Sequence, residues 1–492
     1  MGKLGEQGAP LGVNAAPVSR NEPVSGARER QVPLFDYCAV QASMRLEFRA
    51  PNLSAYHSSL PVPPARVRAT AGVLGCAGLL QPELFFHALV WLGFGVFAAL
   101  VFWRAFLFLV ATTPGFKRFL TLNIPKEVEL PVYTVLVPLY REAPAVLGLA
   151  AAMSAMRWPQ GRLDILLLLE TGDTETQDAV FAAEWPMGTR VLIVPKGAPQ
   201  TKPRALNYGL QYARGTLVCI YDAEDRPHPG QLLAAYSAFA QGAEETACVQ
   251  APLAAYNHRQ SWIALHWSLE YAVQFGLLLP ALARLRLPIL LGGTSNHFKM
   301  SVLRTLGGWD AWNVTEDADL GVRLARRGYR SDLITLPTFE EAPETLGVWT
   351  AQRSRWLKGF LQTWAVMMRS PAEVIRTSGW PAYLALNAML IGTCLAALVH
   401  GPLFLGLLIW VCFMDGAIAG PGLWLLVAGY AVNAIALLSA PGPKGMRRWL
   451  GAVTLPLYWP LHSLAALRAL YGWVRTPHFW AKTPHGLTAH PG

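Results

Sequence analysis

The sequence predicts an α/β domain inserted between membrane helices, and three observations lead to this fold class. Of the 492 residues, 53% are hydrophobic and only 15% are charged, whereas ordinary soluble domains carry about 25% charged residues. Long apolar runs lie toward both ends of the chain. Between them, short β-rich runs alternate with helical stretches, which is typical of a mostly parallel sheet covered by helices.

The charge and the cysteines narrow the class of protein. The net charge of +10 does not require nucleic acid, because Lys and Arg gather on the cytoplasmic flanks of membrane helices. A basic surface also suits anionic lipid or a nucleoside diphosphate. No two of the six cysteines are spaced as Cys-x-x-Cys, so we expect neither a disulfide framework nor a zinc site. A reduced catalytic domain facing the cytoplasm fits this pattern.

The N-terminal part divides into two segments. Residues 1–65 are rich in Gly, Ala, Pro and Ser without a periodic pattern, which predicts a mostly disordered segment without a cleavable signal peptide. Residues 66–112 predict a membrane hairpin. Its long leg, Leu84–Trp103, has the roughly 20 residues needed to cross a bilayer, while its short leg, Ala69–Leu80, is marginal. Basic flanks place both ends in the cytoplasm; the alternative is one crossing after an interfacial piece.

Residues 127–345 are predicted to form the cytoplasmic α/β domain. Helical stretches such as Pro144–Met156 and Ala205–Ala213 separate the β-rich runs. In such sheets ligands bind beyond the carboxyl ends of the strands, so polar motifs at those ends are candidate site residues. The four predicted strands are Val132–Leu139, Asp164–Leu169, Val191–Val194 and Thr216–Tyr221.

Residues 346–375 predict an amphipathic helix in the membrane interface. Its large apolar residues, from Trp349 to Met368, recur at steps of seven and four, which places them on one face. A buried core helix is the alternative. Residues 380–473 are apolar and predict a transmembrane bundle followed by a cytoplasmic tail, 474–492. The bundle's four candidate segments, two of them 382–399 and 403–414, would put the basic turn Lys444–Arg448 outside, against the distribution expected for basic loops.

Three motifs carry the chemistry. Asp222, Glu224 and Asp225 follow a β-rich run directly, and clustered carboxylates are the ligands that Mg²⁺ or Mn²⁺ takes beside substrate phosphates. The alternative is a solvated acidic turn.

The second motif is Thr315-Glu316-Asp317. A carboxylate near the metal site could accept the proton of an attacking hydroxyl group. The same residues could also simply begin a helix, with Thr315 as its cap and the acids in its first turn, and both interpretations can hold together.

The third motif is Gln352-Arg353-Ser354-Arg355-Trp356. Its indole offers a face for stacking a sugar ring, and its guanidinium groups can bind a diphosphate in bidentate fashion. Trp and Arg are also common in a membrane-surface anchor, which is the alternative.

Taken in order, these motifs resemble inverting family-2 glycosyltransferases of the GT-A fold, of the cellulose synthase and hyaluronan synthase type. The resemblance covers about residues 130–370, and the tail from Phe479 to Gly486 also resembles bacterial members. Further motifs that carry it are Val137-Pro138-Leu139-Tyr140-Arg141-Glu142, Lys202-Pro203-Arg204-Ala205-Leu206-Asn207 and Gly292-Gly293-Thr294-Ser295-Asn296.

The resemblance implies a processive enzyme that polymerises a β-linked glycan from a cytoplasmic nucleotide sugar, with UDP-glucose and a β-glucan favoured. It implies Mg²⁺ or Mn²⁺ at Asp222, Glu224 and Asp225, and Asp317 as general base within its triplet. Acceptor contacts are expected at Trp356 and Gly293-Thr294-Ser295-Asn296. The nucleotide-sugar contacts are expected at Pro138, Tyr140, Glu142, Lys202, Asp222, Gln352, Arg353, Arg355 and either Glu170 or Asp173.

Two rival functions remain at this point: a non-processive transferase that adds one sugar to a lipid-linked acceptor, and a catalytically dead export subunit. Two positions depart from the family pattern. The usual Asp-Asp-Gly reads Glu170-Thr171-Gly172-Asp173, and the second metal position is Glu224 rather than Asp. We expect a multi-pass protein of the bacterial inner membrane, with possible accessory export or regulatory subunits and no nucleic-acid partner. Control by cyclic-di-GMP would need another site or subunit.

Overall fold

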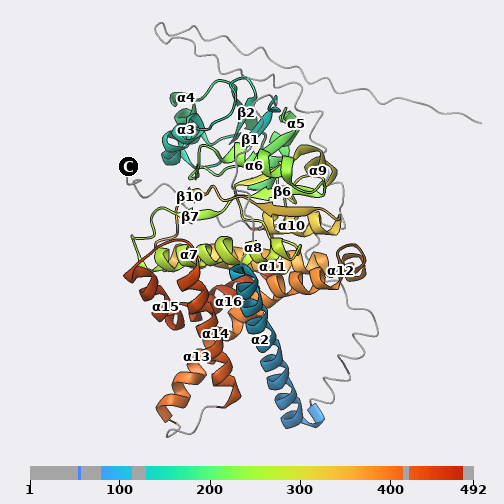
Figure 1. The fold of residues 1–492 in the computed structure, drawn as a ribbon, viewed down its shortest axis with the longest axis vertical. Coiled ribbons are helices and arrows are strands. Elements are labelled where there is room, and N and C mark those ends of the chain that lie inside the picture. The colour runs from blue at the N-terminus through green and yellow to red at the C-terminus, as the bar shows by residue number, and fades with distance from the viewer. Residues whose placement is uncertain (1–53, 57–71, 73–78, 114–128, 414–419, 480–492) are drawn as a thin grey trace, which may run out of the picture.

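The computed structural model describes residues 54–56, 72, 79–113, 129–413 and 420–479. An α/β domain lies at one end, a layer of helices lies across it, and long apolar helices project from the far side of that layer (Figure 1). Most of the segment predicted to be disordered and of the predicted tail lies outside the described residues.

A seven-stranded sheet with the order β3-β2-β1-β4-β8-β6-β9 forms the centre of the α/β domain. Only β8 runs antiparallel to its neighbours, β4 and β6. The mostly parallel α/β sheet is therefore confirmed, and the four predicted strands lie within two residues of their expected bounds. The strands are β1 (Tyr133–Leu139), β2 (Leu163–Glu170), β3 (Thr189–Val194), β4 (Leu217–Ile220), β6 (Thr246–Gln250), β8 (Asn296–Lys299) and β9 (Arg330–Leu333).

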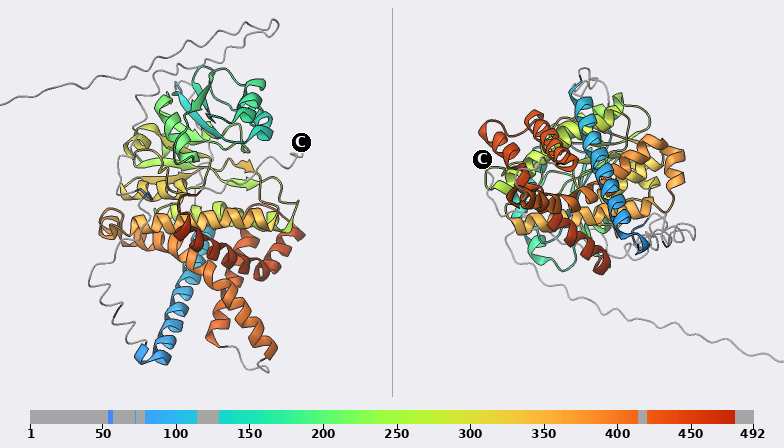
Figure 2. Two further views of the ribbon diagram at one scale, coloured as in Figure 1. Left: turned by 180° about the vertical axis from the view of Figure 1, so that it is seen from behind. Right: turned by 90° about the horizontal axis from the view of Figure 1, so that it is seen from below.

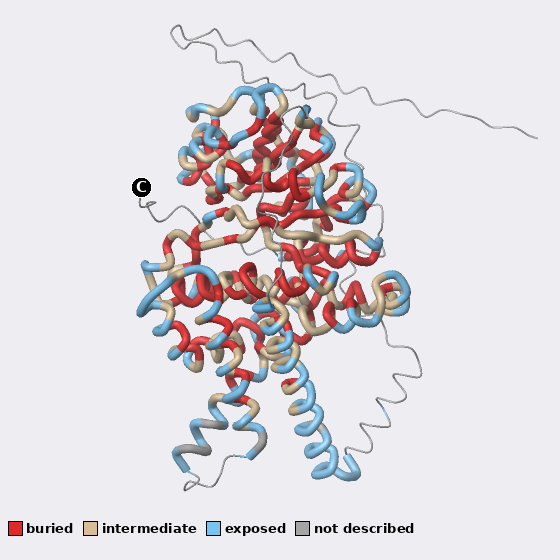
Figure 3. Tube along the Cα trace, in the orientation of Figure 1, coloured by how far each residue is buried: buried red, intermediate tan, exposed pale blue. Residues whose placement is uncertain are grey.

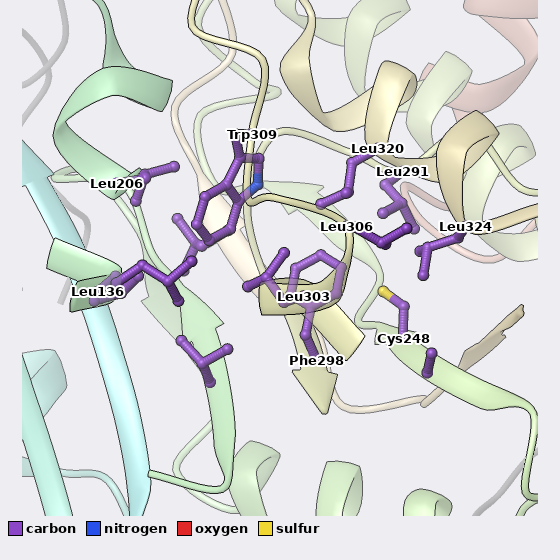
Figure 4. Close-up of a cluster of buried hydrophobic side chains, with 14 of the residues drawn as sticks. Leu136, Leu206, Cys248, Leu291, Phe298, Leu303, Leu306, Trp309, Leu320 and Leu324 are labelled. Carbon is purple, nitrogen blue, oxygen red and sulfur yellow. The ribbon is translucent and has the colours of Figure 1, made fainter. Parts of the chain in front are cut away.

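The central strands are mostly apolar because both faces of the sheet are covered. Every residue of β2 is buried, and Leu136 of β1 pairs with Leu166. Figure 4 shows one of the two main side-chain clusters, in which Leu136, Phe298 and Trp309 contribute from separate elements. The covering helices are α3 (Val146–Ser154), α4 (Thr174–Ala182), α5 (Lys202–Tyr212), α6 (Gln231–Gln241), α9 (Met300–Thr305) and α10 (Glu316–Arg326).

A small second sheet connects the domain to the helix layer. It has the order β5-β10-β7 and lies between the main sheet and α7 (Figure 1). Its strands are β5 (Arg226–Pro227), β7 (Leu253–Ala255) and β10 (Thr338–Glu340). Since β5 follows the acidic turn after β4, the pairing of β5 with β10 brings Glu340 toward that turn.

The helix layer contains α7 (Trp262–Val273), the π-helical turn η5 (Gln274–Leu278), α8 (Leu279–Arg284) and α11 (Leu346–Met367). Figure 2 shows from behind that this layer separates the α/β domain from the long apolar helices. α11 packs along α16 (Pro460–Arg475) on one side and contacts α10 on another. Trp349 is fully buried and Trp356 half-buried. Much of α11 is therefore buried against its neighbours, and its place in the membrane interface stays a prediction.

Within the described residues, three helices are long and apolar enough to cross a membrane: Pro82–Thr112, Pro371–Gly406 and Gly422–Ser439. A pair bent by 51°, Met446–Tyr458 with Pro460–Arg475, could supply a fourth. The predicted long leg of the N-terminal hairpin lies within α2 (Pro82–Thr112), while most of the short leg falls outside the described residues. Much of the outer surface of α2 is exposed (Figure 3), as expected for a face that contacts lipid.

The C-terminal helices also settle the position of the basic turn. The described residues of segments 382–399 and 403–414 belong to one helical run, so they are not two crossings. The run begins after the kink at Gly379 in α12 (Pro371–Asn387) and continues through η6 (Ala388–Gly392) and α13 (Thr393–Phe413). α14 (Pro421–Ser439) then returns, and Arg447 in α15 (Met446–Tyr458) donates to the Arg259 carbonyl at 3.5 Å. The basic turn therefore lies at the end of the bundle nearest the α/β domain.

Candidate active site

One cavity of about 590 Å³ begins in the α/β domain and continues into the helix bundle. Its first end is polar, and its second end lies among α2, η5, α13 and α14. Among the predicted site residues, those that line it are Pro138, Tyr140, Glu142, Glu170, Lys202, Asp222, Glu224, Gly293, Thr294, Thr315, Glu316, Asp317, Gln352, Arg353, Arg355 and Trp356.

Lys202 connects two sides of the polar end. It is the first residue of α5, and its Nζ lies 2.5 Å from Asp222 Oδ1 and 2.6 Å from the Gly293 carbonyl oxygen. Burial alone would lower the pKa of Lys202, but the Asp222 and Glu316 carboxylates raise that pKa above its ordinary value. The ammonium group therefore stays charged, as a diphosphate-binding group must.

The carboxylates of the acidic turn after β4 lie in two different environments. Asp225 is fully buried and does not line the cavity; its Oδ2 accepts from the Asp222 amide at 2.7 Å and from the Thr294 hydroxyl. Burial, with the Asp222 and Glu224 charges, raises the pKa of Asp225 well above its ordinary value. Asp225 thus shapes the turn, whereas Asp222 and Glu224 line the cavity; the expectation that Asp225 also binds metal stays a prediction.

The same end fits a divalent cation. Glu340, missed in the sequence, joins Asp222 and Glu224 in the lining, and burial with the neighbouring carboxylates raises its pKa well above the ordinary value. The buried Asp225 Oδ1 and Glu340 Oε1 have no hydrogen-bond partner within the described part of the chain. No three His, Cys, Asp or Glu residues in that part form a closed cage. This suits Mg²⁺, which uses one or two carboxylates with substrate phosphates.

The structure distinguishes Glu170 from Asp173. Glu170 ends β2, lines the cavity and accepts from Arg204 Nη2 at 2.9 Å. Asp173 caps α4, with its carboxylate accepting from the amides of Thr176 and Arg141, and it does not line the cavity. Asp173 therefore orders the loop after β2, and of the two carboxylates only Glu170 lines the cavity.

The Thr315-Glu316-Asp317 triplet begins α10 and also lines the cavity. Thr315 holds the N-cap position, although its side chain makes no capping hydrogen bond. Burial raises the pKa of Asp317, and burial with the Asp317 charge raises the pKa of Glu316 to about 8. A Cβ at Gly293 would lie 3.6 Å from Asp317 Oδ2, so the glycine leaves open space beside the carboxylate. The helix-start interpretation and the base interpretation are compatible.

The third motif lies on α11 and faces the interior of the protein. Gln352 Oε1 accepts from Trp267 Nε1 at 2.9 Å, and Arg355 Nη1 donates to the Val314 carbonyl at 3.0 Å. Trp356 lines the cavity and stacks on Tyr271, with ring centroids 6.0 Å apart and an interplanar angle of 20°. A membrane-surface anchor would face outward, so this alternative does not describe the motif.

Arg353 lies at the border with the helix bundle. Its guanidinium pairs with Glu270 and lies 4.5 Å from the ring centroid of Trp356. Glu270, in α7, also accepts from the Tyr458 hydroxyl at 2.8 Å. Arg353 therefore fixes Trp356 against the bundle in this structure.

The Gly-rich motif before β8 is only partly a cavity wall. Gly293 and Thr294 line the cavity, but Ser295 and Asn296 are buried and do not. Ser295 has a φ of 57° and its hydroxyl lies 2.6 Å from that of Thr338, while the Asn296 amide group donates to the Gly292 carbonyl. These two residues shape the loop, and the expectation that they contact the acceptor is not supported.

Sequence reasoning missed the polar residues at the bundle end, Arg104, His400 and Asn433, and also Tyr271 behind Trp356. Arg104 gave a visible signal, because it interrupts an apolar run, and ionisable residues within membrane helices mark functional sites by default. The others have no such signal, since a single polar residue in an apolar helix more often satisfies a neighbouring backbone group.

Comparison with known proteins agrees with this geometry. Residues 217–436 match the model described as "Glycosyl transferase family group 2", and the domain has the GT-A α/β fold with long apolar helices flanking it. The chain is 27% identical over 256 residues to a probable glycosyltransferase, YdaM, of Bacillus subtilis, covering 50% of this chain and 60% of that protein.

Two further relatives differ in what their names say they make. The cellulose synthase catalytic subunit of Xanthomonas axonopodis is 28% identical over 238 residues, covering 47% of this chain and 32% of that protein. The β-monoglucosyldiacylglycerol synthase of Trichormus variabilis is 23% identical over 299 residues, covering 56% and 61%. This chain thus spans from about a third to about three fifths of these relatives.

A solved structure of the Pyrobaculum calidifontis mannosyltransferase PcManGT with GDP-Man and Mn²⁺ aligns with a TM-score of 0.48 and 19% identity. The alignment covers 79% of this chain and 97% of that one.

Proposed function

We propose that this chain is a membrane-embedded inverting glycosyltransferase that builds a β-linked polysaccharide, with UDP-glucose as the favoured donor and a β-glucan as the favoured product. One observation carries the proposal: the cavity that contains Lys202, Asp222 and Asp317 continues to His400 and Asn433 inside the helix bundle. A chain growing at Asp317 would enter this passage directly and would not have to cross lipid.

The donor half of the cavity supplies charge complementarity. Tyr140 and Glu170 would contact the nucleoside, and Lys202 would bind the diphosphate through its ammonium group. Asp222 and Glu224 would hold Mg²⁺ or Mn²⁺, which neutralises diphosphate charge and assists its departure.

The acceptor half carries out the transfer. Trp356, backed by Tyr271, would stack the terminal sugar of the acceptor, and Arg355 would stabilise the leaving diphosphate. The acceptor hydroxyl oxygen bonds to the anomeric carbon while the bond to the diphosphate breaks, and Asp317 accepts the hydroxyl proton. Displacement in one step inverts the anomeric centre, which gives a β-linkage from an α-linked donor.

A second candidate is a transferase that adds one sugar to a lipid-linked acceptor. The bundle end of the cavity favours it in one respect, because Phe97, Leu100 and Leu278 line that end with apolar surface. The relative named as a β-monoglucosyldiacylglycerol synthase points in the same direction. The polar lining contributed by His400 and Asn433 suits a hydroxyl-rich polymer better.

The proposed setting is the bacterial inner membrane, with the α/β domain in the cytoplasm where nucleotide sugars are made. The basic turn Lys444–Arg448 lies at the same end of the bundle as that domain, as expected for cytoplasmic loops. Under this proposal residues 127–345 are the catalytic domain, 380–473 the transmembrane bundle and 474–492 a cytoplasmic tail.

The test is a donor screen with the purified full chain in nanodiscs and Mg²⁺ or Mn²⁺. UDP-glucose, UDP-N-acetylglucosamine and GDP-mannose are assayed for nucleotide release and for high-molecular-weight product. We expect polymer from UDP-glucose, with the linkage identified by specific hydrolases. Nucleotide release without polymer would favour the single-sugar transferase, and no release from any donor by folded protein would contradict both.

A further inference from the structure

A short N-terminal segment lies far from its sequence neighbours. Ser54 Oγ donates to Asp310 Oδ1 at 2.9 Å, and the Ala55 amide donates to Asp310 Oδ2 at 2.6 Å. Asp310 is fully buried. A buried carboxylate is stable only when it is hydrogen-bonded or paired. This contact, between residues more than 250 positions apart, supplies two hydrogen bonds to the Asp310 carboxylate.

The segment is held on two further sides. The Tyr56 ring lies 4.6 Å from that of Trp312, and His478, near the C-terminal end of the described chain, packs against both rings. The Ser54 carbonyl oxygen accepts from Arg369 Nη1 at 2.8 Å. Segments from both ends of the chain therefore meet at Asp310 and Trp312.

These two residues belong to the base loop, residues 309–314, which leads directly into Thr315-Glu316-Asp317. The loop starts at Trp309, buried in the core shown in Figure 4. Its Ala311 carbonyl accepts from Thr201 Oγ1 at 3.0 Å, beside the start of α5, and its Val314 carbonyl accepts from Arg355. The base loop is thus tied to the donor side, to the acceptor side and to the N-terminal segment.

We propose that residues 54–56 form a strap that positions the base loop, and that Asp310 is the positioning residue through which the strap acts on Asp317. The strap does not line the cavity, so it contacts neither donor nor acceptor. Without it, the Asp310 carboxylate loses two of the donors that fix its orientation, and the base loop loses one of its attachments. The proposal rests on the role proposed above for Asp317.

The geometry predicts a specific kinetic effect. Donor-binding groups such as Lys202 and Glu170 lie on other elements, so the strap should leave donor affinity unchanged. Misplacement of a catalytic group by about 1 Å can cost up to about 100-fold in rate. We therefore expect loss of kcat with little change in the donor KM; because a smaller folded fraction would lower the apparent kcat in the same way, kcat is calculated per folded protein.

The experiment uses point variants of the full chain in nanodiscs. Ser54→Ala removes the hydroxyl group, Ser54→Thr keeps it, and Asp310→Asn replaces one acceptor with an amide that opposes a donor of the strap. Ser301→Ala and Asp178→Asn, both at exposed positions, are matched controls. Amide hydrogen exchange across residues 310–317 is measured beside donor KM and kcat.

We expect Ser54→Ala and Asp310→Asn to speed exchange across 310–317 and to lower kcat by about 10- to 100-fold, with the donor KM within about twofold, while Ser54→Thr and the controls resemble wild type. Unchanged exchange in Ser54→Ala and Asp310→Asn would overturn the strap, and so would unchanged kcat in active protein or equal damage from Ser54→Thr. If wild-type protein releases no nucleotide, the proposed function fails, but the exchange measurement still decides whether the strap holds the loop.

Discussion

At the scale of single residues, Asp317 sits in an environment suited to a base. It lines the cavity, and burial raises its pKa while Lys202 and Arg355 act in the opposite direction. A carboxylate with a raised pKa accepts a proton more readily than an exposed one, and general bases work best when their pKa approaches the working pH. Burial and the two cations therefore act together on the pKa of Asp317.

Replacing Asp317 with Asn tests this assignment. Asp317→Asn should lower transfer by about 10²- to 10⁴-fold, the usual contribution of a positioned base, and leave nucleotide affinity nearly unchanged, because the base acts in the transition state. Nucleotide release gives the rate, and calorimetric titration with UDP gives the affinity. Transfer at a near-wild-type rate would show that another group takes the proton.

The pH dependence of kcat follows from the same burial. The base must be deprotonated, and the pKa of Asp317 is raised while that of Glu316 is about 8. Activity should therefore be present above the pKa of Asp317 and fall as pH decreases through it, at a pH above the value of about 4 for an exposed carboxyl group.

Measurement of kcat from about pH 5 to about pH 9, at saturating donor, checks the position of this acidic limb. Glu316→Gln removes the neighbouring carboxylate, so its limb should move to lower pH. A wild-type limb near the ordinary carboxyl pKa would contradict the effect assigned to burial.

At the scale of elements, α10 and α11 approach closely where the two catalytic motifs meet. A Cβ at Gly359 would lie 2.1 Å from Thr315 Oγ1, so only glycine allows this spacing. The close approach holds Arg355 within reach of the Val314 carbonyl. One glycine thus sets the distance between the base triplet and the Gln352–Trp356 motif.

Gly359→Ala should force these helices apart. We expect a loss of about 1–3 kcal/mol in the free energy of unfolding, as for other overpacked sites, and a fall in kcat. Gly347→Ala is the matched control, because it lies in the same helix with no atom within 4 Å of its Cβ position; it should be neutral or slightly stabilising. Thermal unfolding and nucleotide release measure both effects, and equal behaviour of the variants would contradict the packing argument.

The local sequence pattern was sufficient to predict the strands and the residues at their ends. Runs such as Leu163–Glu170 are mostly apolar because both sheet faces are covered, and their ends locate Glu170 and the turn at Asp222. The separate roles of Asp222 and Asp225 could not be predicted, since adjacent acids look alike until Thr294 binds one of them. The strap was equally hidden, because its partner Asp310 lies far away in the sequence.

At the scale of the whole molecule, the helix layer connects the polar end of the cavity with the helix bundle. α7 and α11 contribute Tyr271 and Trp356 to the polar end of the cavity, while the packing of α11 on α16 extends the same layer into the bundle. The pairing of Arg353 with Glu270 lies at this border. A product released from the polar end would therefore meet the bundle passage without leaving the protein.

The bundle passage itself distinguishes a polymerase from a single-sugar transferase. Ala396 lines the cavity on α13, whereas the adjacent Leu395 is 39% exposed on the outer face. Ala396→Phe should narrow the passage and shorten the polymer, because elongation requires the chain to advance, while release of nucleotide in the first transfer continues. Leu395→Phe places the same aromatic ring on the outer face of the helix, although it adds less volume than Ala396→Phe, and should leave polymer length unchanged. Gel filtration of radiolabelled product measures length for both variants. Full-length polymer from Ala396→Phe would mean that the product leaves by another route. The continuous cavity would then give no reason to prefer a polymerase to a transferase that acts on a lipid-linked acceptor.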